Sequence, residues 1–547
     1  MRQASDLFVE CLEKEGVEYI FGLPGEESLA LLESIRKSSI KLVVTRHEQA
    51  AAFMAATCGR LTGTAGVVLS TLGPGATNLV TGVAYAQLGG MPLVVVTGQK
   101  PIRKSKQGQF QIINVLQMMQ PITKATRQIA SPELIPSLVR DSFRRAEEER
   151  PGAVHLEFPE DIAAEQTDAR ALEKITALRA VPDRSAVETA ARMIEAARSP
   201  LILIAAAANR KKDRDELVEL VTNTGIPFFT TQMGKGVIDE RSGNCLGTAA
   251  LTENDFLHRA LEKSDLIISI GHDVTEKPPF RMGYGGRKVI HVNFYPAPID
   301  DVYFPTFEVI GDIASSVRAL ASEIRVSADW DFGYFRKVIT EFRNHTLEKA
   351  NDPSFPLKPE RFVADLRSTV PEDGILALDN GMYKIWIARN YPAYEQNTVL
   401  LDNALASMGA GLPAAIAAKL IRPGKKVVCV CGDGGFMMNS QELETAIRLG
   451  VDLTVIIVND GGYGMIKWKQ DSMCLPSFGL EFGNPDFVEY AGSFGARGRR
   501  IGSAEEFSGV LAECIGSGGL SIIDCPVDYS ENVKVLTDEL TARTCKL

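Results

Sequence analysis

The segment KKVVCVCGDGGFMMNSQELETAI (Lys425–Ile447) says most about the fold of this chain. Its apolar run, Val427 to Cys431, predicts a buried strand that stops at Gly432-Asp433-Gly434-Gly435, and a helix is predicted after these glycines. Glycine and aspartate are also common in plain turns. Open α/β sheets, however, bind ligands where strands end and helices begin. The segment therefore indicates either a structural turn or a ligand site, and the rest of the chain has to distinguish them.

Strand-like runs separated by helical segments recur along the chain. Ala65–Gly98 and Val427–Asp460 both read as strand, glycine turn, helix and strand, and Pro200–Thr231 is a looser copy without the glycine turn. This order is typical of parallel βαβ units. We therefore predict an α/β protein with three doubly wound parallel-sheet domains, of which the first and third are more alike.

Two polar stretches with few strand signals, about 164–186 and about 326–356, are the predicted domain boundaries. The predicted domains are 1–165, 186–326 and 356–530, and a helical or loose tail is predicted at 531–547. A length of 547 residues fits roughly three or four domains.

Composition excludes several classes of function. The net charge of −10 argues against a nucleic-acid-binding protein, which would carry a basic face. No apolar run approaches the roughly 18 residues of a membrane span, and the N-terminus predicts a charged amphipathic helix rather than a signal peptide. The nine cysteines are scattered without a CxxC pair, which argues against zinc and structural disulfides. We expect a cytoplasmic protein without a nucleic-acid or membrane partner.

A second aspartate follows the next predicted strand. LTVIIV ends in Asn459-Asp460-Gly461-Gly462-Tyr463, so that Asp460 lies 27 positions after Asp433. Adjacent parallel strands would bring both carboxylates to one edge of a sheet, where Mg²⁺ prefers carboxylates together with phosphate oxygens. The glycines allow a diphosphate to approach the backbone, and the following helix adds a favourable dipole. Together the two turns favour a metal–diphosphate site.

Other phosphate motifs are absent or weak. The chain has no GxxxxGK[ST] loop. Gly409–Ala414 matches a dinucleotide fingerprint by letter, but it does not follow a strand directly, so helix packing is the better interpretation.

The motif GDGGF…ND resembles the diphosphate-binding motif of thiamine diphosphate enzymes. The resemblance covers the whole chain. FGLPGEESLALLESI, TRHEQAAAFMAATCGRLTG and TLGPGATNLVTGVAYAQ are similar to the pyrimidine-binding domain of that family, and GMYKIWIAR, ASMGAGLPAAIAAK and ELETAIRL are similar to its acetolactate synthase branch, particularly the catabolic members. The resemblance implies pyrimidine-binding, central and diphosphate-binding domains. It also implies a homodimer or homotetramer with active sites at the subunit interface.

Glu48 is the predicted catalytic residue. It lies in HEQAAAFMAA, and from the residues alone it is either a solvated helix glutamate or a carboxylate facing an apolar pocket. The resemblance implies that Glu48 hydrogen-bonds the pyrimidine of thiamine diphosphate and thereby leads to deprotonation of the thiazolium carbon. It further implies that Pro24 and Gly25 pack beside the pyrimidine and that Ala406 offers it a carbonyl. Met408, otherwise a core methionine, would wedge between the two cofactor rings.

The resemblance also assigns the diphosphate and metal contacts. Asp433, Asp460 and the backbone oxygen of Gly462 are the implied Mg²⁺ ligands, and aspartate at position 460 agrees with the catabolic branch. The remaining implied cofactor contacts are Asn380, Gly381, Met382, Tyr383, Gly432, Gly434, Gly435, Tyr463, Gly464, Met465 and Ile466.

The substrate residues are less well defined. Phe110 and Gln111 align with the substrate channel of acetolactate synthases, although Gln111 could equally be a solvated loop residue. Glu160, Trp468 and Lys469 depart from the family pattern. Lys469 could pair with the carboxylate of an acceptor or lie exposed, and Glu160 would repel that carboxylate if it faced the channel.

The segment GHDVTEKPPF (Gly271–Phe280) resembles the branch without FAD, so FAD is not expected. The leading hypothesis is decarboxylation of pyruvate and carboligation to a second 2-ketoacid, giving 2-acetolactate and CO₂. The alternatives are a 2-ketoacid decarboxylase without ligation and a carboligase with another donor or acceptor. A non-catalytic protein with this fold would not need Glu48, Asp433 and Asp460 together.

Overall fold

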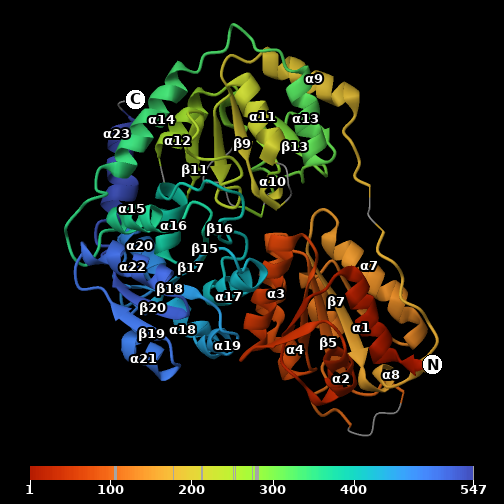
Figure 1. The fold of residues 1–547 in the computed structure, drawn as a ribbon. Coiled ribbons are helices and arrows are strands. Elements are labelled where there is room, and N and C mark those ends of the chain that lie inside the picture. Colours follow the sequence, from red (N-terminus) through yellow and green to blue (C-terminus); the bar gives the residue numbers. More distant parts are fainter. Residues whose placement is uncertain are drawn as a thin grey trace. The chain divides into compact units, whose positions relative to one another are not determined.

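The computed structural model describes residues 1–103, 108–175, 178–210, 214–250, 252, 254–273, 275–276 and 282–545. Its core consists of three six-stranded sheets in which all neighbouring strands are parallel (Figure 1). The predicted α/β class with three parallel-sheet domains is confirmed. The chain forms two compact units: unit 1 contains Met1–Ala177, Ala404–Pro423 and Asn439–Val451, and unit 2 contains the rest.

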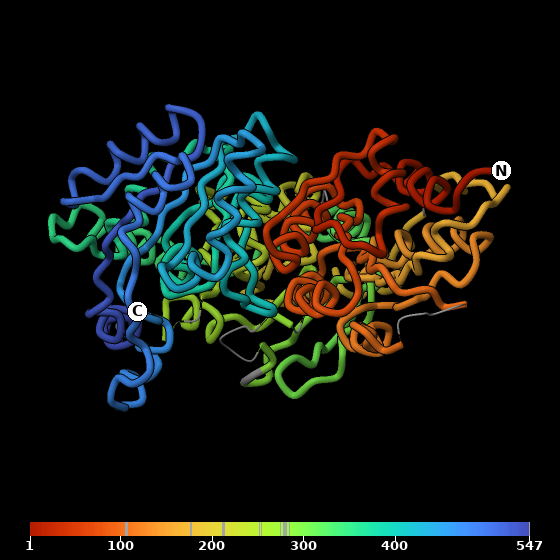
Figure 2. Tube along the Cα trace, turned by 90° about the horizontal axis from the view of Figure 1, so that it is seen from below, coloured from red at the N-terminus to blue at the C-terminus, as the bar shows by residue number. Residues whose placement is uncertain are grey.

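The four inner strands of the sheet of unit 1 are buried almost throughout, as expected of a parallel sheet covered on both faces, whereas its two edge strands are partly exposed. Its strands, in spatial order, are β3 (Lys41–Val44), β2 (Tyr19–Gly22), β4 (Gly66–Ser70), β5 (Leu93–Gln99), β7 (Ala153–Pro159) and β6 (Ala125–Gln128). The helices are α1 (Ala4–Glu15), α2 (Leu29–Lys37), α3 (Glu48–Thr62), α4 (Pro74–Asn78), α5 (Val80–Gly89), α6 (Val115–Met119), α7 (Ile135–Glu147), α8 (Glu160–Ala163), α17 (Gly411–Ile421) and α19 (Glu442–Arg448). At the edge, β1 (Arg2–Gln3) pairs antiparallel with β8 (Gln166–Thr167), which joins the start of the chain to the end of this domain (Figure 2).

Unit 2 contains the two other sheets. The middle sheet has the order β11 (Cys245–Ala249), β10 (Phe228–Thr231), β9 (Pro200–Ile204), β12 (Leu266–Ile270), β13 (Lys288–Asn293) and β14 (Phe307–Ile310). Alternate residues of β9 face opposite sides: Ile202 and Ile204 pack in one apolar cluster, and Leu201 and Leu203 pack in another. The sheet is therefore covered on both faces, by α9 (Arg184–Glu195), α10 (Ala206–Arg210), α11 (Arg214–Thr224), α12 (Phe256–Lys263), α13 (Ile313–Glu323) and α14 (Gly333–Leu347).

The third sheet has the order β16 (Val399–Leu400), β15 (Ile375–Leu378), β17 (Val427–Gly432), β18 (Leu453–Asn459), β20 (Leu520–Pro526) and β19 (Arg497–Arg500). Its helices are α15 (Pro359–Thr369), α16 (Met382–Asn390), α18 (Asp433–Asn439), α20 (Gly464–Ser472), α21 (Phe487–Ser493) and α22 (Glu506–Gly516). The chain ends in a helical segment, with a π-helix at Lys534–Glu539 followed by α23 (Leu540–Thr544).

Strand order explains why the first and third repeats look alike in sequence. In the first and third sheets the first strand in the sequence lies next to an edge strand, and the two strand orders match position by position. In the middle sheet the first strand, β9, lies at the centre, and later strands are added on both sides of it. In the first and third sheets the order in which strands are added reverses between β2 and β4 and between β15 and β17, although the strands themselves are parallel. Ligands of open α/β sheets bind at the carboxyl ends of strands at such switch points.

The predicted start of the helix after β17 was wrong. The helix after β17 begins at Asp433 itself, not after Gly435, and it ends at Asn439 before α19 starts. Gly434 and Gly435 are thus helical, and neighbouring side chains lie too close to allow any other residue at these positions. A Cβ on Gly435 would lie 2.6 Å from Asp379 Oδ2, and a Cβ on Gly434 would lie 2.9 Å from the Tyr463 ring. Among the residues that the model covers, no helix is long and apolar enough to cross a membrane.

Candidate active site

Asp433 is fixed at the carboxyl end of β17. Its Oδ1 accepts a hydrogen bond from the Gly434 N–H at 2.8 Å, and its Oδ2 accepts from the Gly461 N–H at 2.9 Å and from Asn484 Nδ2 at 2.8 Å. Burial raises the pKa of this carboxyl and outweighs these hydrogen bonds. The Gly461 bond joins the turn after β17 to the turn after β18, which is the neighbouring strand, with Gly432 opposite Val458.

Asp460 lies at the same edge. Desolvation by the surrounding protein, followed by the charge of Asp433, raises the pKa of the Asp460 carboxyl to about 7, although its side chain still reaches solvent. A Cβ on Gly464 would lie 2.5 Å from Asp460 Oδ2, so that only glycine allows this carboxylate to rest on the start of α20. Two carboxylates whose pKa values are raised at one sheet edge are stabilised in their charged form when a divalent cation lies beside them.

The donor set fits Mg²⁺ bound together with a phosphate group. No cluster of three or more His, Cys, Asp or Glu side chains that could hold a metal occurs among the described residues. Mg²⁺ is usually held by one or two carboxylates and completes its shell with phosphate oxygens and water. Gly462, whose backbone oxygen is the third expected ligand, lies in the turn between Asp460 and α20 and pairs with Glu481 through an isolated bridge.

The turns after β15 and β17 form a glycine-lined cradle around Tyr383. A Cβ on Gly381 would lie 2.5 Å from the Tyr383 ring, and a Cβ on Gly432 would lie 3.2 Å from it. The Tyr383 hydroxyl is buried and makes no geometrically acceptable hydrogen bond in the described structure, and burial, followed by the charge of Asp379, raises its pKa. An unsatisfied buried hydroxyl costs about 1–3 kcal/mol. A phosphate oxygen in this cradle would remove that cost.

Asn380 and Lys384 continue the cradle. Asn380 is buried directly after β15, and Lys384 Nζ donates to Asn380 Oδ1 at 2.6 Å and to the Asp402 carbonyl at 3.0 Å. Burial lowers the pKa of Lys384 to about 8. Met382 is buried beside Tyr383 at the start of α16, whereas Met465 is half-buried and Ile466 exposed on α20.

Glu48 is the first residue of α3 and belongs to unit 1. Its carboxylate is buried, with 8% of the residue exposed, and Oε2 accepts a hydrogen bond from Asn78 Nδ2 at 2.9 Å. A Cβ on Gly75 would lie 3.3 Å from Oε1, so that this glycine keeps the other oxygen accessible. The alternative of a solvated helix glutamate is wrong, because α3 is buried along most of its length.

Glu442 supports the loop that leads into Glu48. It is fully buried in α19, and its Oε1 accepts from the backbone N–H groups of Arg46 at 3.0 Å and His47 at 3.1 Å. Thr445 Oγ1 donates to Oε2 at 2.6 Å. Burial raises the pKa of Glu442 against these hydrogen bonds. Glu442 is therefore a positioning residue for the start of α3.

Replacing Glu442 by alanine would leave the partly buried N–H groups of Arg46 and His47 without their acceptor. We expect Glu442→Ala to lower the free energy of unfolding by about 2–4 kcal/mol, because each such group costs about 1–3 kcal/mol. Thermal unfolding measures the effect. Glu444→Ala, which removes only a surface ion pair with Arg448, is the matched control and should change stability by less than about 1 kcal/mol. Equal unfolding temperatures for the two variants would contradict this role.

Pro24 and Gly25 follow β2 at the switch point of the first sheet. A Cβ on Gly25 would lie 2.4 Å from the Thr71 Cβ, in the turn after β4. Glu27, just beyond, accepts from the Thr71 hydroxyl and forms a buried ion pair with Lys100. The two turns at this switch point are thus held together.

Ala406 and Met408 lie in the segment of unit 1 before α17. Ala406 is exposed with a φ of +55°, a left-handed conformation that costs about 1–3 kcal/mol for a residue with a side chain. Such strain is found where a backbone group has a functional orientation, which agrees with the expected carbonyl contact. Met408 is half-buried, and the Gly409 carbonyl after it accepts from Asn439 Nδ2 at 2.7 Å.

Within their own units, the expected substrate residues are exposed or half-buried. Phe110 is 64% exposed, and Gln111 is exposed with a φ of +59°, although its backbone rests against the turn after β4 at Gly73. Lys469 is exposed and Trp468 half-buried on α20. Burial raises the pKa of Glu160, which starts α8, and Lys100 opposes that rise.

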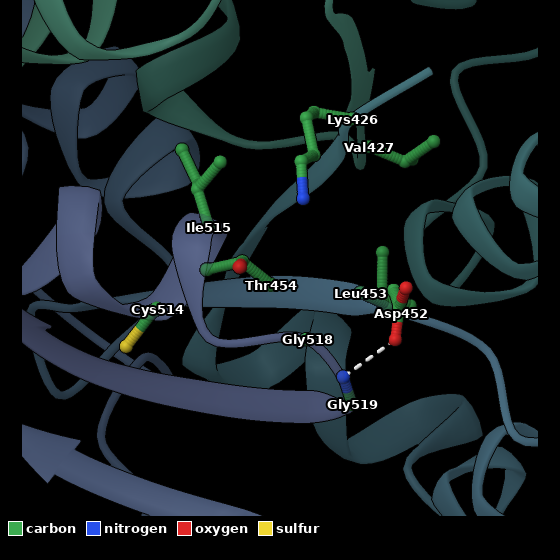
Figure 3. Close-up of a pocket in the computed structure, with 9 residues that line it drawn as sticks. All are labelled: Lys426, Val427, Asp452, Leu453, Thr454, Cys514, Ile515, Gly518 and Gly519. Atoms are coloured by element: carbon green, nitrogen blue, oxygen red, sulfur yellow. Dashed lines mark hydrogen bonds between the residues drawn. The ribbon is translucent and has the colours of Figure 1, made fainter. Parts of the chain in front are cut away.

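A small cavity shown in Figure 3 lies at the opposite edge of the third sheet. It has a volume of about 10 Å³ and is lined by the starts of β17 and β18, where Asp452 Oδ1 accepts from the Gly519 N–H at 2.6 Å. This is room for about one water molecule. It is not a cofactor site.

Three contributors were not identified from the sequence: Asn484, which binds Asp433, Asn78, which binds Glu48, and Glu442. Their partners lie 51, 30 and 395–396 positions away in the chain. Glu442 and Asn78 lie in segments with recognised motifs, ELETAIRL and TLGPGATNLVTGVAYAQ, but neither was given a role there, and Asn484 lies outside the quoted motifs.

Comparison with known proteins agrees with the geometry. Three family models match: the thiamine pyrophosphate enzyme N-terminal TPP binding domain at residues 2–118, the central domain at 187–320 and the C-terminal TPP binding domain at 379–525.

Curated relatives match along nearly the whole chain. The acetolactate synthase of Bacillus subtilis is 34% identical over 98% of this chain and 95% of its own. The catabolic acetolactate synthase of Raoultella terrigena is 34% identical over 96% of this chain and 95% of its own. A probable acetolactate synthase large subunit of Methanocaldococcus jannaschii is 32% identical over 97% of this chain and 92% of its own. The chain belongs to the thiamine diphosphate-dependent enzymes and is an acetolactate synthase-like member of that family.

Proposed function

We propose that the protein is an acetolactate synthase that uses thiamine diphosphate and Mg²⁺ to decarboxylate pyruvate and join the remaining two-carbon unit to a second pyruvate. The observation that carries the proposal is that one chain, 34% identical to a catabolic acetolactate synthase, contains both a buried Glu48 in unit 1 and a glycine-lined cradle at Asp433 in unit 2. The reaction converts two pyruvates into one 2-acetolactate and one CO₂.

The cofactor, when bound, supplies the carbon acid that adds to the ketoacid and stabilises the charge left by CO₂. Glu48 would exchange a proton with the pyrimidine nitrogen: it is a buried carboxylate at the start of α3, and only its Oε2 is bonded to Asn78 in the described structure. Asp433, Asp460 and the Gly462 carbonyl would hold Mg²⁺, and the Tyr383 hydroxyl would donate to the diphosphate. Pro24, Gly25, Ala406 and Met408 would orient the pyrimidine.

One feature of the middle domain supports our expectation that the protein does not bind FAD. Glu276 is buried, and its Oε2 accepts from the Ala206 N–H at 3.1 Å, in the first turn after β9. In dinucleotide-binding sheets this turn holds a phosphate, and a carboxylate at that point disfavours one. The segment that led to the expectation, Gly271–Phe280, lies partly outside the described residues, which omit 274 and 277–280.

Carbon balance tests the function. Purified protein with thiamine diphosphate, Mg²⁺ and pyruvate should consume two pyruvates for each CO₂ released. One pyruvate per CO₂ would indicate a decarboxylase without ligation. No pyruvate consumption would overturn the donor assignment.

We infer that the active protein is a homodimer or homotetramer with each site built from two subunits. Glu48 belongs to unit 1 and Asp433 to unit 2, which supports a site that needs two parts of the fold. Mixing inactive Glu48→Gln and Asp433→Ala subunits should restore part of the activity, because some hybrid sites would keep both residues. Verified hybrids without activity would show that each chain builds its own site.

A further inference from the structure

A cavity of about 690 Å³ lies within unit 2, away from the cofactor residues. Its walls come from the start of β11, the end of α14, the end of α15 and the segment after α16. The cavity is at the amino edge of the middle and third sheets, whereas Asp433 and Asn380 are at the carboxyl edge of the third sheet. Its volume is typical of sites for small organic ligands, and it is large for a three-carbon ketoacid.

Four arginines line this cavity. Two of them form ion pairs with carboxylates, and in the described part of the chain the other two do not. Arg389 is neutralised by a buried ion pair with Asp255, and Arg241 pairs with Asp239 and Glu372. Arg343 and Arg367 have no carboxylate within ion-pair distance in the part of the chain that the structure describes. Arg343 donates to the Arg241 and Ser242 carbonyls, and Arg367 donates to the Val370 and Pro371 carbonyls and to Tyr391.

The carboxylates in the walls do not supply the missing counter-charge. Glu240 accepts from Lys235 Nζ at 2.6 Å and from the Ala393 N–H at 2.9 Å. Glu360 lies 3.7 Å from Lys349, and Glu372 is held by Arg241. The Nε of Arg367 is buried and has no hydrogen-bond partner. Two guanidinium groups are therefore left to interact with an anion.

Aromatic rings keep the Arg367 guanidinium in place, whereas Arg343 is held by the two backbone carbonyls to which it donates. The Tyr394 ring lies between Arg241, whose guanidinium carbon is 4.0 Å from the ring centroid, and Arg367, at 4.6 Å. Stacked guanidinium groups lose little freedom when they bind an anion, and they recognise carboxylates and phosphates with paired hydrogen bonds. Phe342, Val370 and Pro392 give the same cavity an apolar surface.

We propose that this cavity binds a small organic anion that carries one carboxylate or phosphate on an aromatic or apolar body. Arg343 and Arg367 bind the anionic group, and Tyr394, Phe342 and their apolar neighbours contact the body. The site is distinct from the cofactor site and does not depend on the proposed reaction.

Calorimetric titration of the protein saturated with thiamine diphosphate and Mg²⁺ tests this site. The probes are AMP, which carries a phosphate, and 3-phenylpropionate, which carries a carboxylate; adenosine and 3-phenylpropanol are their uncharged counterparts. We expect at least one anion to bind once per chain, and its uncharged counterpart to bind at least tenfold more weakly. Binding of AMP alone would identify a phosphate ligand, and binding of 3-phenylpropionate alone a carboxylate.

Arg343→Met and Arg367→Met should each weaken that binding at least tenfold, since methionine keeps much of the packing without the charge. Arg336→Met, on the exposed side of the same helix α14, is the matched control and should bind like the wild type. Circular dichroism and unfolding temperature show whether each variant is folded. If only one of the two arginine variants folds, that variant alone is enough for the test. The proposal is overturned if neither anion binds, if the uncharged compounds bind equally well, or if both folded variants keep wild-type affinity.

Discussion

Glu48→Gln should lower kcat for pyruvate about 10²–10⁴-fold while the protein stays folded and binds thiamine diphosphate. This is the range by which general acid–base catalysis accelerates reactions. Glutamine keeps the volume of the side chain and an oxygen that can accept from Asn78 Nδ2, but it cannot take up or release the proton. Steady-state kinetics at saturating cofactor measures the loss.

Glu33→Gln, on the exposed surface of α2 in the same unit, is the control for this variant and should keep wild-type turnover. Far-UV circular dichroism of both variants should match that of the wild type. A Glu48→Gln enzyme with wild-type kcat would remove Glu48 from the proposed proton transfer.

Asp433→Ala should weaken Mg²⁺-dependent binding of thiamine diphosphate about 100-fold or more. Loss of an outer-shell partner already costs up to about 100-fold in metal affinity, and Asp433 is an expected direct ligand. The substitution also removes the acceptor for Gly461 and Asn484, so that the turns after β17 and β18 lose their connection. Calorimetric titration of cofactor with and without Mg²⁺ measures the effect.

Asp452→Ala is the matched control, because Asp452 lies at the opposite end of β18 and holds only the Gly519 N–H. Its cofactor affinity should equal that of the wild type. If Asp433→Ala bound thiamine diphosphate as tightly as Asp452→Ala did, the metal site would have to lie elsewhere.

The fold could be predicted because its determinants are local. Continuous apolar runs such as Val427–Cys431 are typical of parallel strands buried on both faces, and glycine turns mark their ends. The different strand order of the middle sheet could not be read from the same pattern, because it depends on which strands pair across the chain.

The glycines show the limit of sequence patterns most clearly. Gly434 and Gly435 were predicted to lie in a turn before the helix, but they are helical, and the close approach of Tyr463 and Asp379 leaves no room for a side chain at either position. Close approach of this kind involves residues far away in the sequence. The same reason explains why Glu442 was not assigned a role: its carboxylate binds backbone groups about 400 positions earlier.

The cofactor motif was recognisable because its residues follow strand ends at a fixed interval. The substrate residues have no such regularity. Phe110 and Gln111 lie in an exposed loop, and Trp468 and Lys469 lie on a helix surface, so that neither their partners nor the ketoacid they contact follows from spacing.

The central claim is that the protein joins two pyruvates in a reaction that needs thiamine diphosphate, the Glu48 carboxylate and the Asp433 cradle. NMR of the products formed from ¹³C-labelled pyruvate with thiamine diphosphate and Mg²⁺ tests it most directly. We expect labelled 2-acetolactate in the wild type and none above background in Glu48→Gln. Acetaldehyde as the sole product, or pyruvate left unchanged, would contradict the claim.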